Sequence, residues 1–402
     1  MIMRAAHRES CSIKSSSAFS GLPFLVIGCG FSGAVIAERI ANDLGEKVVV
    51  VDRHPVPGGL SFSEIDAPSG IEIHRYGSHI FHTSDREVWR YVNRFCGFNQ
   101  YCHRVFAALN GELYSLPVNL LTVNRFFHRN LRPQDVKSFL AGMAGDGGQS
   151  GRTSFEKEAI GKIGPELFQA FFEGYSRKQW GEYYELLDEK IFARLNVRYS
   201  LNSNYFTDFY QGIPVDGYGE LFRNMLRNPK ITLMQNVDFD EIRSLLPAEC
   251  RVICTGTPEM LFHEKFGRLK WRSVRFEFSR HPVPDWQGTS VVNYPDAGVP
   301  YTRIHEFKHF HPENPAVMAY PETVICHEYP CPASSADEPM YPVGDAESRR
   351  LMRLYQDEAD RAGNLFLAGR LGSYRYLNMD QAIRQSLDLY SEIKRRHTAS
   401  VK

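Results

Sequence analysis

The stretch Phe24-Leu-Val-Ile-Gly-Cys-Gly-Phe-Ser-Gly33 predicts a buried strand that runs directly into the first turn of a helix. Gly28, Gly30 and Gly33 form the pattern G-x-G-x-x-G, and a second apolar run, Lys47–Asp52, ends in a carboxylate. Glycines at this spacing allow a tight turn, close approach of the backbone to a pyrophosphate, and packing of helix on strand. The sequence therefore predicts a βαβ unit with a dinucleotide site, in which the carboxylate accepts a hydrogen bond from a ribose hydroxyl.

A second glycine pair, Gly58-Gly59, follows six residues after Asp52. A glycine pair at this place gives the backbone room beside a bulky cofactor, which is typical of FAD proteins of the glutathione-reductase-like kind. The alternative is an ordinary Pro/Gly turn after a strand. The motifs later in the chain favour FAD.

Composition excludes several function classes. The 402 residues contain 47 basic and 47 acidic side chains without a run of like charge, which argues against nucleic acid as a partner. The eight cysteines form no C-x-x-C pair, so we expect reduced thiols in a cytoplasmic protein rather than disulfides or a zinc site. No apolar stretch approaches the roughly 20 residues of a membrane span.

The order of patterns predicts an α/β fold with two insertions. Helical periodicity dominates about 120–195, and alternating apolar and polar residues predict a sheet over about 270–345. We expect a Rossmann-like, FAD-binding domain assembled from both ends of the chain, with an inserted helical domain and an inserted antiparallel sheet domain. The expected parts are a flexible extension (1–22), the cofactor domain (23–119, 201–265 and 363–402), the helical insertion with a mobile loop (120–200) and the substrate-binding sheet domain (266–362).

Six further segments carry a resemblance that spans about Phe24 to Ile393. They are Tyr76–Thr83, Phe171–Gly181, Asn204–Phe206, Gln211–Pro214, Val299–Ile304 and Gly369–Asp380. Together with the glycine motif, and in the same order and spacing, they resemble the UDP-galactopyranose mutases. That family uses FAD to interconvert the six- and five-membered ring forms of a nucleotide sugar.

The resemblance implies that Arg194 and Arg303 grip the diphosphate of the substrate. Guanidinium groups suit this role because they bind phosphate oxygens bidentately and stay charged; the alternative for each is a surface ion pair. Arg370 matches an arginine beside the flavin, and His82 lies in the segment that passes the isoalloxazine. We predict these four as catalytic residues.

The resemblance also implies the walls of both binding sites, with Trp180 on a loop that closes over the substrate. The expected substrate residues are Phe171, Phe172, Tyr175, Trp180, Arg194, Asn204, Tyr205, Arg303, Tyr341 and Tyr376. The expected cofactor residues are Gly28, Gly30, Phe31, Ser32, Gly33, Asp52, Arg53, Gly59, Leu60, His79, Arg370, Tyr376 and Leu377. For Phe171 and Phe172 an ordinary place in the hydrophobic core is nearly as good an interpretation, and for His79 and His82 a structural role remains open.

The implied reaction converts UDP-galactopyranose to UDP-galactofuranose without net redox change. N5 of reduced flavin attacks the anomeric carbon, so the enzyme needs FAD in its reduced form and a reductant such as NADPH or NADH. A UDP-sugar is the expected partner, and a homodimer the expected assembly. N-acetylated or deoxy sugars, or another nucleotide, remain open as substrates, as do a flavin-dependent oxidase and a non-catalytic nucleotide-binding module.

The segment His305-Glu-Phe-Lys-His309 formally matches the H-E-x-x-H zinc-protease motif. That motif binds zinc only on a helix, where both histidines share one face. Here the preceding residues predict a strand and the following His-Pro-Glu-Asn-Pro predicts a turn. We therefore predict no metal site.

Overall fold

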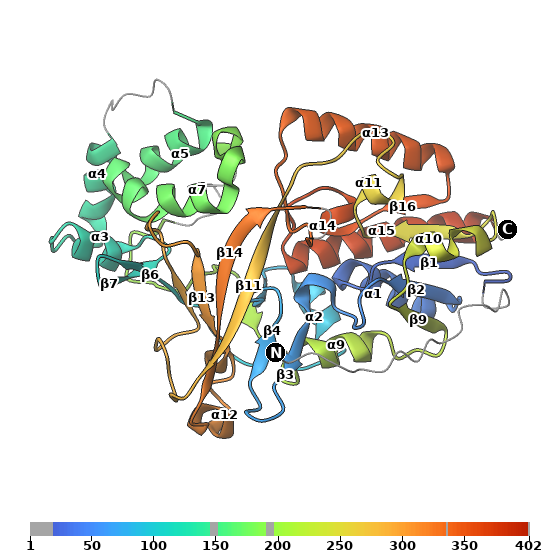
Figure 1. The fold of residues 1–402 in the computed structure, drawn as a ribbon, viewed down its shortest axis with the longest axis horizontal. Coiled ribbons are helices and arrows are strands. Elements are labelled where there is room, and N and C mark those ends of the chain that lie inside the picture. The colour runs from blue at the N-terminus through green and yellow to red at the C-terminus, as the bar shows by residue number, and fades with distance from the viewer. Residues whose placement is uncertain (1–18, 145–151, 190–196, 335–336, 401–402) are drawn as a thin grey trace.

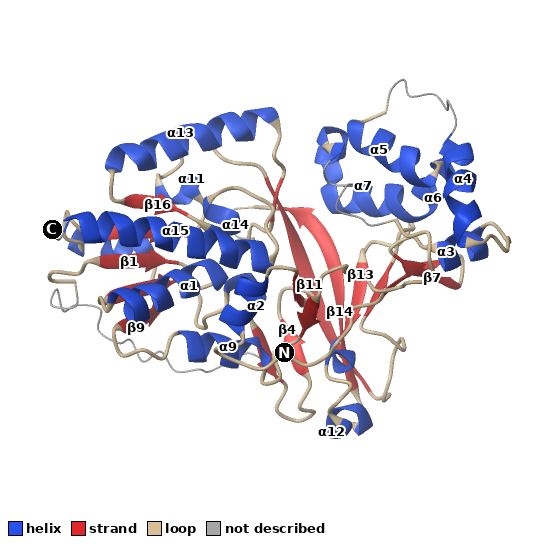
Figure 2. Ribbon diagram, turned by 180° about the vertical axis from the view of Figure 1, so that it is seen from behind, coloured by secondary structure: helices blue, strands red, loops and turns tan. Residues whose placement is uncertain are grey.

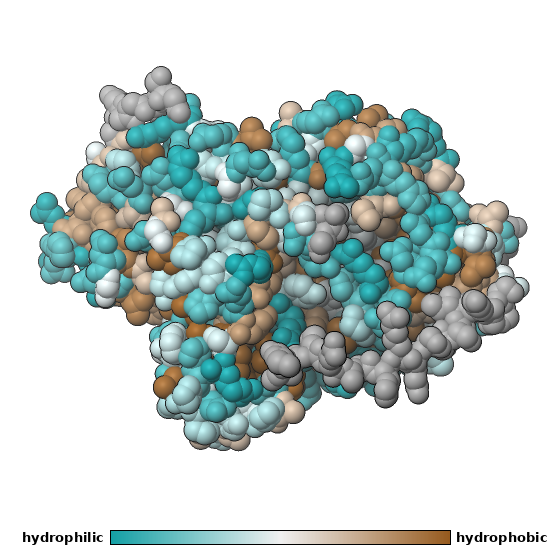
Figure 3. Space-filling model, in the orientation of Figure 1, coloured by the Kyte–Doolittle hydropathy of each residue, from teal (hydrophilic) through white to brown (hydrophobic). Residues whose placement is uncertain are grey.

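The computed structural model describes residues 19–144, 152–189, 197–334 and 337–400. Three parts follow one another across the molecule: a helical unit, a large twisted sheet, and an α/β unit with a parallel sheet (Figure 1). On the face shown in Figure 3, hydrophobic residues lie in small groups among hydrophilic ones. No helix in the described ranges combines the length and the apolar character needed to cross a membrane.

A five-stranded parallel sheet forms the centre of the α/β unit. Its order is β16-β10-β1-β2-β9. The strands are β1 (Phe24–Ile27), β2 (Val48–Asp52), β9 (Ile231–Gln235), β10 (Arg251–Cys254) and β16 (Leu365–Leu367). The β-branched run of β2 is buried throughout, because α1 (Phe31–Arg39) and α15 (Met379–Ser400) cover one face of the sheet (Figure 2). Residues of α10 (Phe239–Ile242) pack over the other face. As predicted, this sheet takes strands from both ends and the middle of the chain.

A seven-stranded sheet of order β15-β11-β14-β13-β12-β6-β7 lies beside it. All neighbours are antiparallel except β12 and β6. The strands are β6 (Val105–Leu109), β7 (Glu112–Leu116), β11 (Trp271–His281), β12 (Val291–Asn293), β13 (Arg303–Glu306), β14 (Thr323–Pro332) and β15 (Tyr341–Pro342).

Two parts of the predicted domain division differ from this arrangement. Strands β6 and β7 lie within 23–119, which we assigned to the cofactor domain, yet they extend the second sheet because β6 pairs with β12. Helix α13 (Ala346–Ala362) lies within the predicted sheet domain, yet it packs on β16 of the parallel sheet. Both exchanges depend on pairing between distant segments, which local patterns do not reveal.

The helical unit covers the β6–β7 end of the second sheet. Its helices are α3 (Leu120–Phe126), α4 (Pro133–Ala144), α5 (Ser154–Ile163), α6 (Pro165–Phe168) and α7 (Gly174–Trp180). A π-helical turn, Gln169–Glu173, joins α6 to α7. A capping box formed by Thr153 and Glu156 fixes the start of α5.

Short elements fill the remaining connections. They are α2 (Arg86–Val92), α9 (Gly217–Met225), α11 (Pro258–Leu261), α12 (Pro315–Ala319), α14 (Gly369–Gly372), β3 (Ser63–Ile65), β4 (Glu72–His74), β5 (Phe81–Thr83) and β8 (Tyr210–Gly212). Two expectations are corrected here. Trp180 is the last residue of α7 rather than part of a loop. Arg370, which the sequence pattern after Asn364 predicts at the end of a strand, lies in α14 instead, because β16 already ends at Leu367.

Candidate active site

The glycine motif forms the turn between β1 and α1. A side chain at Gly33 would place its Cβ 2.0 Å from the Gly28 carbonyl oxygen, so only glycine lets the helix approach the strand this closely. At Gly30 the nearest atoms lie 3.8 Å from such a Cβ, so no neighbour in the protein requires glycine there. The space that Gly30 leaves open belongs to a cavity, which is the arrangement that close approach of a ligand requires.

This cavity has a volume of about 380 Å³ and runs along the carboxyl ends of the parallel strands. The predicted cofactor residues that line it are Gly28, Gly30, Phe31, Ser32, Asp52, Arg53, Gly59, Leu60, His79, Arg370 and Leu377. Gly33 packs beneath the turn, and Tyr376 lies outside the lining. The structure therefore brings segments from three parts of the chain around one elongated space.

The Asp52 carboxylate at the end of β2 is already engaged within the protein. It accepts hydrogen bonds from the backbone N–H of Cys29 (2.6 Å) and of His54 (2.9 Å), and it also pairs with the His54 ring. The other nitrogen of that ring lies 2.8 Å from Glu338, which also accepts from Arg53. A ribose hydroxyl would therefore share Asp52 with these donors, a detail that the sequence pattern does not contain.

Two basic side chains stand at the other end of the cavity. The Arg370 guanidinium donates to the Leu377 carbonyl oxygen (2.6 and 3.0 Å) and to that of Met340 (3.3 Å), which fixes its charge beside the cavity. Burial, together with the neighbouring His74 and Arg370, lowers the pKa of His79 to about 3. His79 is therefore neutral at physiological pH, so Arg370 supplies the positive charge there.

Arg303 and Tyr175 form a second polar group, between β13 and α7. The guanidinium lies 5.6 Å from the centre of the Tyr175 ring, and 31% of the Arg303 side chain is exposed. Among the described residues, neither Arg303 Nε nor the Tyr175 hydroxyl has a hydrogen-bond partner, although both atoms are buried. Buried polar atoms are rarely left without partners, so this pair has the character of a site for a polar ligand.

Aromatic side chains connect these two polar groups. Tyr341 stacks on Tyr376 with ring centres 5.6 Å apart, and the Trp180 ring meets Tyr341 edge-on at 6.5 Å. The Arg370 guanidinium lies 5.1 Å from the centre of the Tyr376 ring. Residues from α7, β15 and α14 thus meet at one place.

A further aromatic wall contains His82. The ring stacks on Phe206 with centres 3.6 Å apart, and its Nδ1 pairs with Asp208 at 2.7 Å. Tyr205 packs edge-on against Phe206, and the backbone N–H of Asn204 donates to Asn202. Asp208 and Phe206 were not predicted, although Phe206 lies within a quoted segment.

Of the remaining predicted substrate residues, two are packed in a hydrophobic core and one lies outside the described ranges. Phe171 is buried against Tyr114 and Phe126 in the core of the helical unit, and Phe172 packs against the same core. For these two the structure fits the alternative interpretation as core residues. Arg194 lies outside the described residues.

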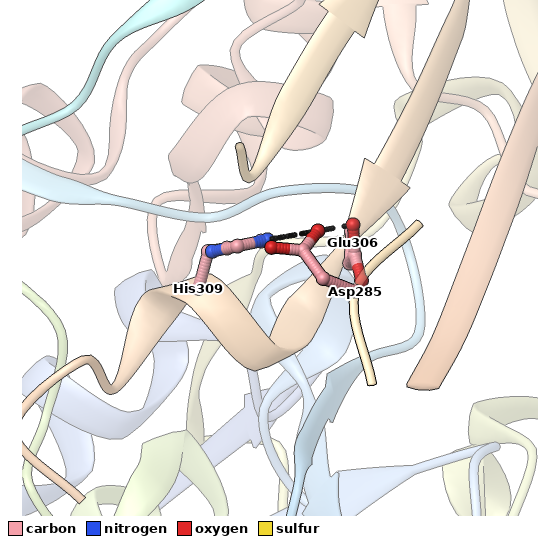
Figure 4. Close-up of side chains that lie close together, drawn as sticks. All are labelled: Asp285, Glu306 and His309. Atoms are coloured by element: carbon pink, nitrogen blue, oxygen red, sulfur yellow. Dashed lines mark hydrogen bonds and ion pairs between the residues drawn. The ribbon is translucent and has the colours of Figure 1, made fainter. Parts of the chain in front are cut away.

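The two histidines of the H-E-x-x-H segment contact different partners. His305 is on β13, whereas His309 follows in a 3₁₀ turn, Phe307–Phe310, so the segment is not a helix of the kind that binds zinc. The His309 ring lies near Asp285 and Glu306 (Figure 4). The Glu306 oxygens already accept from Thr323 and from the backbone N–H groups of residues 286 and 287. Glu306 therefore holds the connection between β11 and β12 against β13 and β14.

The most important residue that the sequence did not reveal is Glu328. It is 3% exposed on β14, directly opposite Arg303 in the sheet register, with Oε2 3.8 Å from the guanidinium. The only sequence signal was a charged residue in an otherwise apolar strand. Burial raises the pKa of this carboxyl, but Arg303 and His305 outweigh burial and lower it to about 2, so Glu328 is ionised.

Comparison with known proteins adds independent findings on family. A sequence profile described as UDP-galactopyranose mutase matches residues 170–376, and one described as an NAD(P)-binding Rossmann-like domain matches residues 26–95. The solved structure of reduced UDP-galactopyranose mutase superposes with a TM-score of 0.69 at 16% identity, covering 92% of this chain and 93% of that one. A putative protoporphyrinogen oxidase from Exiguobacterium shares the fold with a TM-score of 0.61 at 12% identity, over 94% of this chain and 100% of that one.

Two bacterial relatives are similar over almost their whole length. A dTDP-fucopyranose mutase from Escherichia coli is 36% identical over 90% of this chain and 96% of that protein. A probable UDP-galactopyranose mutase from Klebsiella pneumoniae is 35% identical over 92% of this chain and 94% of that protein. The chain belongs to the UDP-galactopyranose mutase family.

Proposed function

We propose that this protein is a UDP-galactopyranose mutase that interconverts UDP-galactopyranose and UDP-galactofuranose with FAD as its cofactor. The observation that carries the proposal is the juxtaposition of two sites. One is a dinucleotide-type cavity, and the other is an arginine–tyrosine pair with unpartnered buried polar atoms; Arg370 and the stacked tyrosines lie between them. An oxidase of the same fold has no evident use for a site that suits a diphosphate.

The residues around the cavity fit FAD. The open space at Gly30 and the positive φ of +125° and +52° at Gly58 and Gly59 leave two neighbouring backbone turns without side chains where they border the cavity, as close approach of a pyrophosphate requires. The N-terminus of α1 adds free N–H groups and the positive end of the helix dipole. When bound and reduced, FAD would supply the nucleophilic nitrogen of the family reaction.

The protein's own groups would then bind and orient the substrate. We assign Arg303, with Arg194, to the diphosphate, where they stabilise the negative charge that grows as UDP departs. Tyr175, Trp180 and Tyr341 would fix the uridine and sugar by stacking and hydrogen bonding. Positioning of the anomeric carbon is the main catalytic contribution that such a site makes.

The sugar and nucleotide have a specific alternative. The 36% identity to a dTDP-fucopyranose mutase is as strong as the identity to the Klebsiella protein, so a thymidine nucleotide of a 6-deoxy sugar is the second candidate substrate. The stacked His82–Phe206 wall is the part of the site from which we expect sugar preference to arise.

A panel of nucleotide sugars tests both candidates. Dithionite-reduced protein is incubated with UDP-galactopyranose, UDP-N-acetylgalactosamine and dTDP-fucopyranose, and pyranose and furanose forms are separated by chromatography. Furanose from UDP-galactopyranose at the highest rate supports the main proposal, whereas fastest conversion of dTDP-fucopyranose selects the alternative. Absence of furanose from all three substrates would contradict both.

We further propose a cytoplasmic homodimer that is reduced by NADPH or NADH. The scattered cysteines without C-x-x-C pairs support the reducing compartment. Sedimentation of the purified protein measures the assembly directly.

A further inference from the structure

A buried chain of hydrogen bonds joins the proposed diphosphate site to the cofactor cavity. Ser78 Oγ lies 2.5 Å from His305 Nδ1, and His305 Nε2 lies 2.8 Å from Glu328 Oε2. The same carboxylate oxygen lies 3.8 Å from the Arg303 guanidinium. Ser78 lies in the segment after β4, His305 on β13 and Glu328 on β14. The contacts therefore link three segments that are distant in the sequence.

The direction of the hydrogen bonds follows from the charge of Glu328. Because its pKa is lowered to about 2, the carboxylate can only accept, and His305 Nε2 must carry the proton. Burial lowers the pKa of His305 itself, so Nδ1 is unprotonated and accepts from the Ser78 hydroxyl. His305 is fully buried and therefore has one fixed tautomer that connects two partners.

At the Glu328 end, the contact restrains the arginine. The carboxylate can be oriented by His305 on one side while it pairs with Arg303 on the other, and the Thr302 hydroxyl donates to the Glu328 backbone carbonyl oxygen at 3.2 Å. A buried carboxylate that lost the His305 donor would turn toward its remaining partners. The guanidinium would then follow it away from Tyr175.

At the Ser78 end, the contact restrains the backbone beside the cavity. Gly77 has a φ of +84°, and a side chain there would meet the Phe276 ring at 3.2 Å and Glu328 Oε2 at 3.4 Å. His79, the residue after Ser78, lines the cavity, and its backbone carbonyl oxygen accepts a hydrogen bond from the Tyr218 hydroxyl. The Ser78 hydrogen bond to His305 is therefore one of the contacts that hold this segment, beside the bond from the His79 backbone N–H to His74 Nδ1.

We propose that His305 is a positioning residue with two separable arms, one that places Arg303 through Glu328 and one that places the segment 77–79 through Ser78. It rests on the proposed function, because the first arm acts on the diphosphate-binding arginine. A buried histidine–carboxylate pair is not needed for stability, because an apolar pair of the same volume stabilises a protein core equally well. The proposed role of these buried polar side chains is to position groups at both binding sites.

Two substitutions at the same position separate the arms. In His305→Gln the amide nitrogen reaches the place of Nε2 and still donates to Glu328, but Ser78 loses its acceptor. In His305→Asn the amide oxygen reaches the place of Nδ1 and still accepts from Ser78, but Glu328 loses its donor. Ser78→Ala removes the second arm alone, and His327→Asn, on β14 beside Tyr301, is the matched control.

The measurements use oxidised holoenzyme, with UDP-galactose affinity by calorimetry and the visible absorption band of bound flavin as two readouts. We expect His305→Asn to weaken UDP-galactose about tenfold or more with the flavin band unchanged, since a charge-assisted pair is disturbed. We expect His305→Gln and Ser78→Ala to shift the flavin band while affinity stays within about threefold of the parent.

The outcome is read from this crossed pattern together with FAD content and melting temperature, which report folding. Equal loss of affinity in the Gln and Asn variants, or no loss in either, would overturn the two-arm role. The unmutated protein is measured alongside the variants. If it binds FAD but not UDP-galactose, the proposed function is refuted, and this result is distinct from a failure of the two-arm role.

Discussion

Among single residues, two side chains of the proposed substrate site have buried polar atoms without a hydrogen-bond partner in the described protein. Arg303 Nε and the Tyr175 hydroxyl are such atoms, and both lie where Glu328 already supplies one countercharge. Buried groups of this kind are expensive without a ligand and favourable with one. A bound ligand with hydrogen-bonding groups would supply the partners that these two atoms lack among the described residues.

Replacing Arg303 by alanine should weaken UDP binding by about 1.5–3 kcal/mol, or roughly one to two decades, because one charge-assisted contact is lost. Arg303→Lys should recover only part of this, since it keeps the charge but loses the planar fork. Arg275→Ala, on the exposed part of β11 where Arg275 pairs with Glu277, is the control and should bind like the parent. Undiminished UDP binding by Arg303→Ala would show that this arginine is misassigned.

Replacing Gly30 by valine should give folded but colourless protein. The nearest protein atoms leave room for a Cβ, so the side chain enters the cavity rather than clashing with the chain. FAD content by absorbance after heat release, and melting temperature by fluorescence, measure the two effects separately. Gly161→Val, at a position in α5 with no atom within 4 Å of a Cβ, controls for the substitution itself.

At the scale of elements, the position of α7 relative to the β12–β13 connection decides whether Tyr175 reaches Arg303. The Lys178 ammonium donates to the carbonyl oxygens of Tyr294, Asp296, Val299 and Tyr301, at 2.6 to 2.9 Å. Gly174 lies so close to this connection that a Cβ would fall 2.3 Å from the Pro295 carbonyl oxygen. The helix and the connection are thus fastened at two points on either side of Tyr175.

Lys178→Met should therefore raise KM for the nucleotide sugar by about tenfold with FAD content unchanged, because four carbonyl oxygens lose their donor and the connection leading to Arg303 relaxes. Steady-state kinetics of the reduced enzyme measure KM and kcat. As a control, Lys162→Met on α5 removes a lysine that forms an exposed ion pair with Glu158. A Lys178→Met enzyme with parental KM would mean that the fastening is irrelevant to the substrate.

At the scale of the whole molecule, a polar contact joins the parallel sheet to the second sheet across the cavity. His54, just after β2, pairs with both Asp52 and Glu338, and the Glu338 backbone carbonyl oxygen accepts from Ser273 of β11. Hydrogen bonds to Asp52 and Glu338 raise the pKa of His54 to about 9. The protonated His54 ring thus connects the parallel sheet to the seven-stranded sheet; we call this contact the His54 clasp.

The His54 clasp should make the folding stability of the protein depend on pH. A folded-state pKa raised from 6.5 to about 9 contributes stability that is fully present below pH 6.5 and is lost as pH rises through 9. The melting temperature of the holoenzyme should therefore fall by a few degrees between about pH 7 and 10. Glu338→Gln should flatten this part of the curve, and an unchanged slope in that variant would assign the loss to other groups.

The sequence was sufficient for features that are local in the chain. It predicted the βαβ unit from Phe24 to Asp52, helical structure in the part of the chain that contains α4 and α5, and the strand-then-turn context of His305. Periodicity and glycine spacing report local backbone geometry, which is why these features could be predicted. It did not predict that β6 and β7 extend the second sheet or that Glu328 faces Arg303. The first depends on pairing of Phe106 with Val292, far apart in the chain, and the second on the register of Arg303 with Glu328, 25 residues apart. No local pattern encodes either pairing.

The most direct test of the central claim is a count of turnovers per electron. If this protein is a mutase, oxidised enzyme should be inactive with UDP-galactopyranose, and one equivalent of dithionite should switch it on. Many turnovers to UDP-galactofuranose should follow without further reductant, since the reaction has no net redox change. Consumption of reductant in proportion to product, or oxygen uptake that matches turnover, would identify an oxidoreductase and contradict the account.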